Sequence, residues 1–422
     1  MLFTLTFILC LAIGVPIFAC LGIPPTMDLL RSPMPLVALA QSLYTGVDQF
    51  PLLAIPCFIL AGAIMSRGGI TADIIDVMSL AVGRVPGGMA VVTILSCMFF
   101  AAISGSGPGT VAAIGTIMIP AMKDRGYHPD FAAAVASSGG TLGILIPPSN
   151  PMIIYGVLAS VSIAELFIAG ILPGLLIGSS LLMVSSIISF RKGYKGQGEP
   201  FKFQKFVNAL YRGKFSLFTP FLVLGGIYLG VFTPVEASVI AVIYAFFVSL
   251  FIKRAIGLRE IWEALSEAST ICGGLVLIMG TAIFFGRFLA LNQVPQNIAA
   301  FMISISDNAL VVLLIITTFL IFLGMFMETL STVIILTPIL LPLMKKLGVD
   351  PIHFGIIFVV TNEVGFLTPP LGVNLFVACS LTNRSIEQIS RKVIPFIIVI
   401  IICMLILIYF PKISLLLPQL MR

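Results

Sequence analysis

The chain is poor in charged residues. It has 23 Lys and Arg and 17 Asp and Glu, so 40 of its 422 residues, or 9%, are charged, where a soluble protein has about 25%. A soluble core needs polar residues to cover it, so the composition excludes a soluble enzyme, a disordered scaffold and a nucleic-acid-binding protein. The net charge of +6 is small for this length, and we interpret it as orientation toward anionic lipid head groups.

Residues typical of catalytic sites are also scarce. The two histidines, His128 and His353, are expected in turns near Pro129 and Pro351, and none of the seven cysteines forms a Cys-x-x-Cys pair. The sequence has no His-Glu-x-x-His, Gly-x-Ser-x-Gly or Gly-x-Gly-Asp motif, and no Gly-x-x-x-x-Gly-Lys-[Ser/Thr] loop for ATP phosphates. This argues against a membrane-embedded enzyme, a metal site and a nucleotide-driven pump.

What the chain has instead is apolar blocks near the length of about 20 residues that a helix needs to cross a bilayer. The first block lacks the basic start and the cleavage site of a signal peptide, so we predict a membrane span there as well. The predicted spans are 2–23, 50–66, 170–190, 215–232, 236–252, 271–286 and 394–411.

Three shorter stretches, 34–48, 69–83 and 256–270, mix apolar residues with a few charged ones. They are either interfacial segments that cover helix ends or arm helices that brace a moving domain against a fixed one. The sequence leaves both interpretations open.

An internal repeat organises the chain. At an offset of 222, residues 110–148 align with 332–370 without a gap, and the matched positions include paired prolines and turn glycines. Each copy has an apolar arm, a polar break, a second arm, a charged turn and an apolar segment interrupted by Pro-Pro. We therefore predict a first inverted repeat at 1–190, a basic cytoplasmic loop and linking helix at 191–235, and a second inverted repeat at 236–422.

The arms of the first copy, 89–103 and 110–122, are too short to span at 1.5 Å per residue. They predict a re-entrant helical hairpin over 89–122, and the second copy predicts another over 308–344, where the longer first arm makes the hairpin less distinct. Because consecutive prolines stop a helix, 129–158 and 351–380 are predicted to be discontinuous helices. Irregular backbone at membrane depth must be buried in protein or line a cavity, so all four breaks indicate one polar site.

Basic residues predict the orientation. Seven of the 23 lie in 191–214, which should be cytoplasmic under the positive-inside rule. Counting crossings outward from this loop predicts a cytoplasmic N-terminus and a periplasmic C-terminus. The hairpin turns at 123–128 and 345–350 are then separated by five crossings, an odd number, so the two copies should have opposite topology. The fold class predicted is an all-α polytopic membrane protein with inverted-topology repeats.

Inverted repeats with broken helices are the architecture of secondary transporters. Half-helix N-termini attract an anionic substrate, while unwound carbonyls and hydroxyls suit a small hard cation. The polar side chains at the breaks are mostly neutral, which favours sodium over a proton as the coupling ion. Glu328 and Glu363 are the exceptions and keep a proton-coupled carboxylate transporter open as the alternative; a channel is a further one, because hairpins also build selectivity filters.

Several stretches resemble one family, the large membrane subunit of tripartite ATP-independent periplasmic (TRAP) transporters. The resemblance is carried by Leu53-Ala54-Ile55-Pro56, Ser104-Gly105-Ser106, Ile146-Pro147-Pro148-Ser149, Gly230-Val231-Phe232-Thr233-Pro234-Val235-Glu236-Ala237 and Leu367-Thr368-Pro369-Pro370. It implies sodium-driven import of an organic acid across the bacterial inner membrane by an elevator-type fold. It also implies two partners, a periplasmic substrate-binding protein and a smaller membrane subunit of about four helices, here a separate chain.

By its motifs, the resemblance places one site for Na⁺, the coupling ion, in each copy. Each site combines the tip of the hairpin with the Pro-Pro break of the same copy. Copy two has Met327-Glu328-Thr329 where copy one has Gly105-Ser106-Gly107, so the equivalence of the two sites stays open. The ion-binding residues expected are Ser104, Ser106, Gly140, Gly143, Pro147, Glu328, Thr329, Thr332, Gly365 and Thr368. The substrate-binding residues expected are Thr110, Thr141, Ser149, Asn150, Ser331, Asn362 and Glu363.

Overall fold

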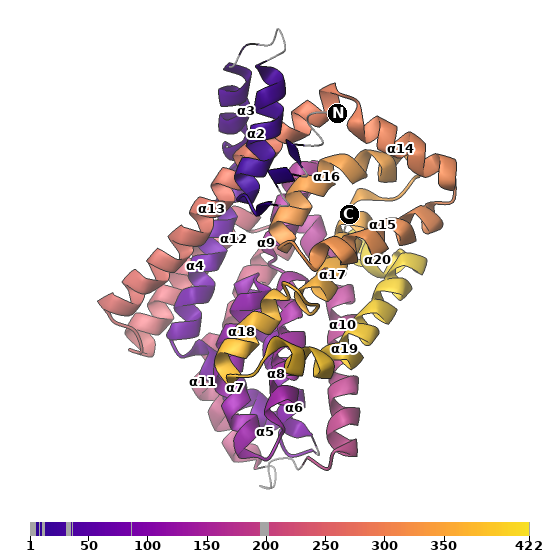
Figure 1. Ribbon diagram of the computed structural model, residues 1–422. Helices are drawn as coiled ribbons and strands as arrows, with labels where there is room; N and C mark the ends of the chain where they lie inside the picture. The colour runs from indigo at the N-terminus through magenta and orange to yellow at the C-terminus, as the bar shows by residue number, and fades with distance from the viewer. Residues whose placement is uncertain are drawn as a thin grey trace.

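The computed structural model describes residues 6–7, 9–10, 13–30, 35, 37–85, 87–194 and 202–421, and every regular element in these ranges is a helix (Figure 1). In chain order the elements are α2 (Ile17–Leu29), α3 (Val37–Val47), η1 (Phe50–Leu53), α4 (Ala54–Arg67), α5 (Ile70–Val82), α6 (Gly88–Ser104), α7 (Gly107–Asp124), α8 (Pro129–Thr141), η2 (Leu142–Ile144), α9 (Asn150–Ala159), α10 (Ile163–Arg191), α11 (Phe203–Tyr228), α12 (Pro234–Phe247), η3 (Val248–Ile252), α13 (Leu258–Leu291), α14 (Val294–Ile305), α15 (Ala309–Gly324), α16 (Thr329–Lys346), α17 (Pro351–Phe366), α18 (Val373–Thr382), α19 (Ile386–Tyr409) and α20 (Lys412–Met421).

The two helical hairpins are present. In the first, α6 ends and α7 begins around Gly105, whose positive φ of 62° suits a residue without a side chain. The Ser106 hydroxyl then accepts a hydrogen bond from the Gly109 amide at 3.3 Å and caps α7. In the second hairpin α15 has 16 residues and α14 precedes it at a bend of 118°. At 1.5 Å per residue α15 is about 24 Å long, so this arm also falls short of a full span.

Both discontinuous helices are present as well, and their bounds repeat the sequence offset. The helices α7 and α16 start 222 positions apart, at Gly107 and Thr329. The helices α8 and α17 also start 222 positions apart, at Pro129 and Pro351. In each copy the helix stops just before the paired prolines and a new half-helix, α9 or α18, begins after them, as the missing amide donors require.

The two copies interlock rather than fold side by side. The hairpin helix α7 packs against α18 of the other copy, and α16 packs against α9. The helix α8 also packs against α18 and α19. This exchange brings the half-helices of both copies to the middle of the molecule (Figure 1).

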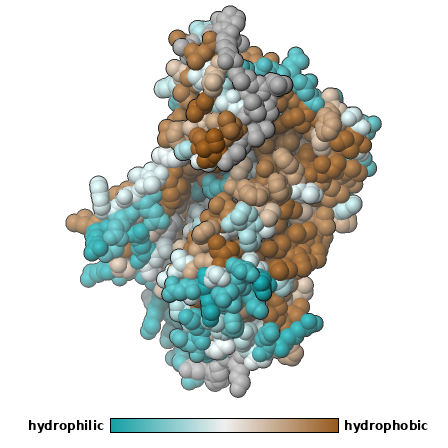
Figure 2. Space-filling model, viewed as in Figure 1, coloured by the Kyte–Doolittle hydropathy of each residue, from teal (hydrophilic) through white to brown (hydrophobic). Residues whose placement is uncertain are grey.

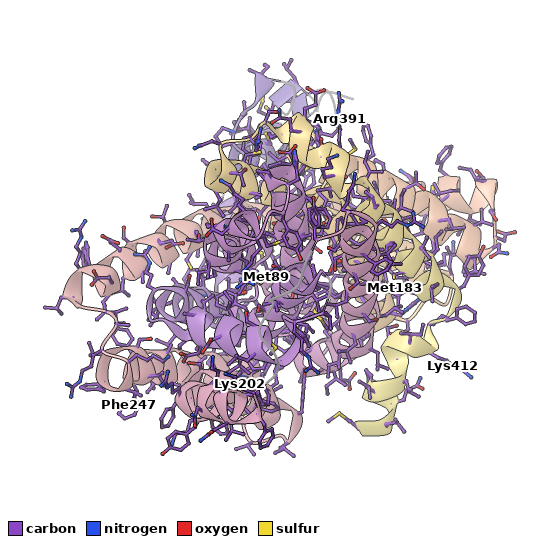
Figure 3. All side chains as sticks on the ribbon, turned by 90° about the horizontal axis from the view of Figure 1, so that it is seen from below. Met89, Met183, Lys202, Phe247, Arg391 and Lys412 are labelled. Atoms are coloured by element: carbon purple, nitrogen blue, oxygen red, sulfur yellow. The ribbon has the colours of Figure 1, made fainter. Side chains whose placement is uncertain are left out.

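Around these elements lies a second group of helices. The long α13 crosses the molecule diagonally in Figure 1 and packs against α2, α3 and α4. Asp73 connects α5 to α11 and to the end of η3. Its carboxylate pairs with Lys253, which follows η3, and accepts a hydrogen bond from the Ser216 hydroxyl of α11 at 2.5 Å. Seen from below, Phe247 of α12 and Lys412 of α20 lie at opposite edges of the bundle (Figure 3).

Six described helices or helix pairs are long and apolar enough to cross a membrane, and α14 with α15 makes a seventh if that bent pair is one span. The six are Phe50–Arg67, Ile163–Arg191, Pro234–Ile252, Leu258–Leu291, Thr329–Lys346 and Ile386–Tyr409. Much of their side-chain surface is apolar and exposed (Figure 2), which is the expected face toward lipid. The chain is thus a multi-pass membrane protein of the all-α class.

Five details of the expected layout are wrong. The block 2–23 is not one span: residues 1–5 lie outside the described part, and the chain turns at Gly14, with φ of 79°, and Pro16 before α2 begins. Of the expected span 215–232, residues 215–228 are the end of α11, and the basic first half of this helix leaves it outside the set of apolar spans. The same helix starts at Phe203, so the expected loop 191–214 is partly helical, with 195–201 outside the described residues.

The other two details concern α13 and a histidine. The amphipathic stretch 256–270, from Leu258 on, and the predicted span 271–286 lie in one helix of 34 residues, which continues through Gly273-Gly274. His353 is not in a turn. It is the third residue of α17, is buried, and its Nδ1 lies 2.6 Å from the Ser414 hydroxyl of α20. A helix cap by Asp350 starts α17 before this histidine.

Candidate substrate and ion site

One cavity of about 740 Å³ collects the ends of the broken elements. Its wall includes the first residues of four half-helices: Gly107 of α7, Asn150 of α9, Thr329 of α16 and Val373 of α18. The first turn of a helix has backbone N–H groups without an intrahelical partner and carries the positive end of the helix dipole. Two such ends come from each repeat, so this cavity is suited to an anion.

The opposite wall comes from α4 and α13. Gly62 and Ser66 of α4 and Ile271 of α13 line it. A Cβ atom at Gly62 would lie only 3.3 Å from the Cα of Ser104, so α4 packs directly on the first hairpin tip. Figure 2 shows the hollow between the α13 arm and the central helices, with hydrophilic surface at the left-hand end of α13.

At the first tip, oxygen atoms gather beside η2. The hydroxyls of Ser104 and Thr110 are 2.9 Å apart, and the Thr110 hydroxyl donates to the Ser106 carbonyl at 2.8 Å. Gly143 lies against them, since a Cβ there would be 2.3 Å from that carbonyl oxygen and 2.7 Å from the Thr110 hydroxyl. Gly140 is similarly close to the backbone of α7, where its Cβ would meet Val111. The two glycines thus permit the close approach and do not supply side-chain ligands.

The tip is also joined to the Pro-Pro break of its own copy. The backbone N–H of Asn150 donates to the Gly105 carbonyl at 3.3 Å. Within the break, the Ser149 hydroxyl donates to the Ile144 carbonyl at 2.5 Å. The side-chain Oδ1 of Asn150 is buried and has no hydrogen-bond partner among the described residues. Because buried polar atoms are usually paired, this oxygen on the cavity wall is available to a ligand.

The second tip repeats this arrangement with different side chains. The Leu371 amide donates to the Met325 carbonyl at 2.9 Å, and Gly365 packs so closely on Gly324 that a Cβ there would be 2.6 Å from the Gly324 carbonyl oxygen. Glu328 stands at the N-cap of α16 without a capping hydrogen bond from its side chain, and the buried Thr329 hydroxyl has no partner in the described part of the chain.

Glu363 occupies a different place. Its side chain is fully buried beside Thr141, and neither carboxylate oxygen has a hydrogen-bond partner within the described residues. The Thr141 hydroxyl donates instead to the Ser138 carbonyl at 2.8 Å. These two residues, one from each copy, therefore meet behind the cavity and not on its wall.

Of the residues expected at the site, five line the cavity: Ser104, Ser106, Asn150, Glu328 and Thr329. Twelve do not reach its wall: Gly140, Gly143, Pro147, Thr332, Gly365, Thr368, Thr110, Thr141, Ser149, Ser331, Asn362 and Glu363. Most of the hydroxyls among these twelve bond to nearby backbone, as Thr332 does to the Glu328 carbonyl at 3.0 Å and Thr368 to the Val364 carbonyl at 2.6 Å.

Among the residues that sequence reasoning missed are three polar or aromatic wall residues and one residue behind the wall. Arg67, Glu267 and Phe366 line the cavity, and Asn374 lies behind Gly107, whose Cβ would be 3.2 Å from the Asn374 Oδ1. A signal for Asn374 existed, since it follows the second Pro-Pro much as Asn150 follows the first. Arg67 and Glu267 lie in segments with no repeat partner, so no internal pattern singled them out.

Comparison with known proteins agrees with this architecture. The sequence matches the family described as Tripartite ATP-independent periplasmic transporter, DctM component, over residues 4–413. It is 43% identical over 408 residues to the isethionate TRAP transporter permease protein DctMQ of Oleidesulfovibrio alaskensis, covering 96% of this chain and 64% of that relative. It is 39% identical over 391 residues to the C4-dicarboxylate TRAP transporter large permease protein DctM of Pseudomonas aeruginosa, covering 93% of this chain and 91% of that relative.

The fold is shared more widely than the sequence. The crystal structure of the Alcanivorax borkumensis YdaH transporter superposes with a TM-score of 0.68 at 15% identity, over 98% of each chain. This likeness concerns the fold, which is elevator-type, with paired hairpins and broken helices. With a family match that spans nearly all its residues, the chain belongs to the DctM component family of the tripartite ATP-independent periplasmic transporters.

Proposed function

We propose that this protein imports an organic acid across the bacterial inner membrane, driven by a sodium gradient. The observation that carries the proposal is the convergence of four half-helix N-termini on one cavity. Four positive dipole ends attract a carboxylate or a sulfonate. One relative is named for isethionate, which is a sulfonate, and another for C4-dicarboxylates, which have two carboxylates.

Sodium coupling is supported by the chemistry of the tips. The oxygens of Ser104, Ser106 and Thr110 form a compact neutral cluster at the first tip, and neutral oxygens suit a hard monovalent cation. Glu328 on the cavity wall is the observation that favours the alternative, proton coupling. The two ions are distinguished by the gradient that drives uptake.

The family relationship supports the partners. We propose a small membrane subunit of about four helices and a periplasmic substrate-binding protein, and the name DctMQ of one relative fits a two-part membrane unit. We also propose that the interlocked half-helices move as one body past α4 and α13, because the cavity lies between these two groups. We also propose a cytoplasmic N-terminus and a periplasmic C-terminus, as the distribution of basic residues predicts.

The test is uptake into proteoliposomes that contain this chain and the small subunit, with the binding protein added outside. Labelled isethionate and labelled succinate serve as probes. We expect accumulation above the external concentration under an inward sodium gradient, and none with choline in place of sodium. Accumulation driven by a proton gradient in choline supports the alternative, and equilibration without accumulation indicates a channel.

A further inference from the structure

Arg67 lines the cavity wall at the C-terminal end of α4. Among the described residues of this wall, Arg67 is the one basic side chain; Glu267 and Glu328 are the acidic ones. Gly62, five residues earlier on the same helix, packs on the first tip at Ser104. Five residues of α-helix are about 7.5 Å, so Arg67 lies about this far along α4 from the contact with the first hairpin tip.

In this structure the guanidinium holds two carboxylates. One terminal nitrogen lies 2.8 Å from Glu263 and the other 2.8 Å from Glu267, both on α13. A guanidinium presents several N–H donors in a planar fork that matches a carboxylate or another oxyanion. The donors used by the two glutamates are therefore those that a substrate carboxylate or sulfonate would use.

The two ion pairs add little to the packing of α4 on α13. Arg67, Glu263 and Glu267 expose 31%, 46% and 52% of their side chains, and exposed pairs contribute about 0–1 kcal/mol. The two helices also pack on each other through other residues. Holding these helices together therefore does not account for an arginine with two acidic partners on a cavity wall.

Release of Glu263 and Glu267 from the Arg67 guanidinium costs little free energy. Glu263 also accepts a hydrogen bond from the Arg259 Nε at 3.0 Å, so it keeps a basic partner when Arg67 lets go. Glu267 is half exposed and can turn to water. Both glutamates can thus leave the guanidinium without leaving a buried, unpaired charge.

We propose that Arg67 is a second anion-binding group for the transported organic acid. Its guanidinium exchanges Glu263 and Glu267 for the carboxylate or sulfonate of the substrate as this moves to or from the half-helix N-termini. This inference rests on the proposed function. It predicts that Arg67 and its two glutamates act in opposite directions on substrate affinity.

The test compares R67Q, R67K and the double variant E263Q/E267Q in the complete transporter, with isethionate and succinate uptake at saturating sodium. We expect R67Q to raise KM about tenfold or more, as for loss of a charge-assisted hydrogen bond. R67K should fall between R67Q and the parent, because an ammonium keeps the charge but not the fork. E263Q/E267Q should lower KM, because the competing carboxylates are gone.

R391Q is the matched control, since Arg391 forms an exposed pair with Glu387 at 2.6 Å and does not line the cavity; its KM should equal that of the parent. If R67Q and E263Q/E267Q impair uptake alike, Arg67 only tethers α4 to α13 and the inference is overturned. Unchanged KM in R67Q overturns it too. Failure of the parent to accumulate either probe under a sodium gradient overturns the proposed function, and this inference with it.

Discussion

Asn150 and Asn374 each lie in the first turn of the half-helix that follows a Pro-Pro pair, and the Oδ1 atom of each is buried without a hydrogen-bond partner among the described residues. Asn150 begins α9 on the cavity wall, and Asn374 lies in the first turn of α18 behind Gly107. The Asn374 Nδ2 donates to the Ser137 carbonyl of the other copy at 3.1 Å. The Asn150 side chain thus lies on the cavity wall, while the Asn374 side chain joins the two repeats.

Asn150→Asp should weaken the binding of an anionic substrate. The change keeps the shape of the side chain and adds a negative charge where four positive helix ends converge. We expect the KM for substrate to rise about tenfold, which is about 1.4 kcal/mol. The control is Asn308→Asp at the exposed N-cap of α15, where Asp caps as well as Asn. Equal KM values for the two variants would contradict the assignment of Asn150 to the substrate site.

Thr110→Val should weaken sodium binding at the first tip. Valine keeps the volume but removes the hydroxyl that contacts Ser104 and the Ser106 carbonyl. We expect the sodium concentration for half-maximal uptake to rise about tenfold, since hydrogen bonds and ligands of this kind contribute about 1–2 kcal/mol. Thr318→Val is the control, because that exposed hydroxyl bonds only to the Leu314 carbonyl of its own helix. The measurement is uptake against sodium concentration at fixed substrate.

Gly143→Ala should disrupt the first tip. Its Cβ would come within 2.3 Å of the Ser106 carbonyl oxygen, which is backbone and has no side-chain freedom. Overpacking of this kind costs about 1–3 kcal/mol, so we expect a lower thermal unfolding temperature in detergent and loss of most uptake. At Gly225 a Cβ meets nothing within 4 Å, and Gly225→Ala should behave as the parent. An unaltered unfolding temperature in Gly143→Ala would refute the close packing of tip and break.

The inverted topology predicts that the two hairpin turns lie on opposite faces of the membrane. Arg125 and Lys346 are exposed at the ends of α7 and α16. In intact cells, Lys346→Cys should react with a membrane-impermeant thiol reagent added outside, and Arg125→Cys should react only after permeabilisation. The parent chain, with its seven native cysteines, gives the background. The reverse labelling pattern would overturn the orientation.

The internal repeat is why the central elements could be predicted from sequence. Proline pairs and turn glycines act on the backbone locally, so the bounds of α7, α8, α16 and α17 follow from the residues themselves. The peripheral elements lacked such markers. The pair Gly273-Gly274 lies just past residue 270, but α13 continues through it where a break was expected.

The site was harder to predict than the fold because burial depends on packing between copies. Thr141 and Glu363 carry the right functional groups for a ligand, but the crossing of the two repeats places them behind the cavity wall. Arg67 and Glu267 lie outside the aligned repeat segments, and only the packing of α4 against α13 brings them together. A sequence pattern shows which residues are polar and not which of them share a surface.

The central claim, that the organic acid binds together with sodium in the cavity of the four half-helix N-termini, is tested most directly by substrate protection of a cysteine in its wall. Ala112 of α7 lines the cavity and is exposed, so Ala112→Cys introduces a reactive thiol there. The account predicts that the transported acid slows alkylation of this cysteine in sodium but not in choline, and leaves the Lys346→Cys thiol unaffected. Equal alkylation rates with and without the acid in sodium would contradict it.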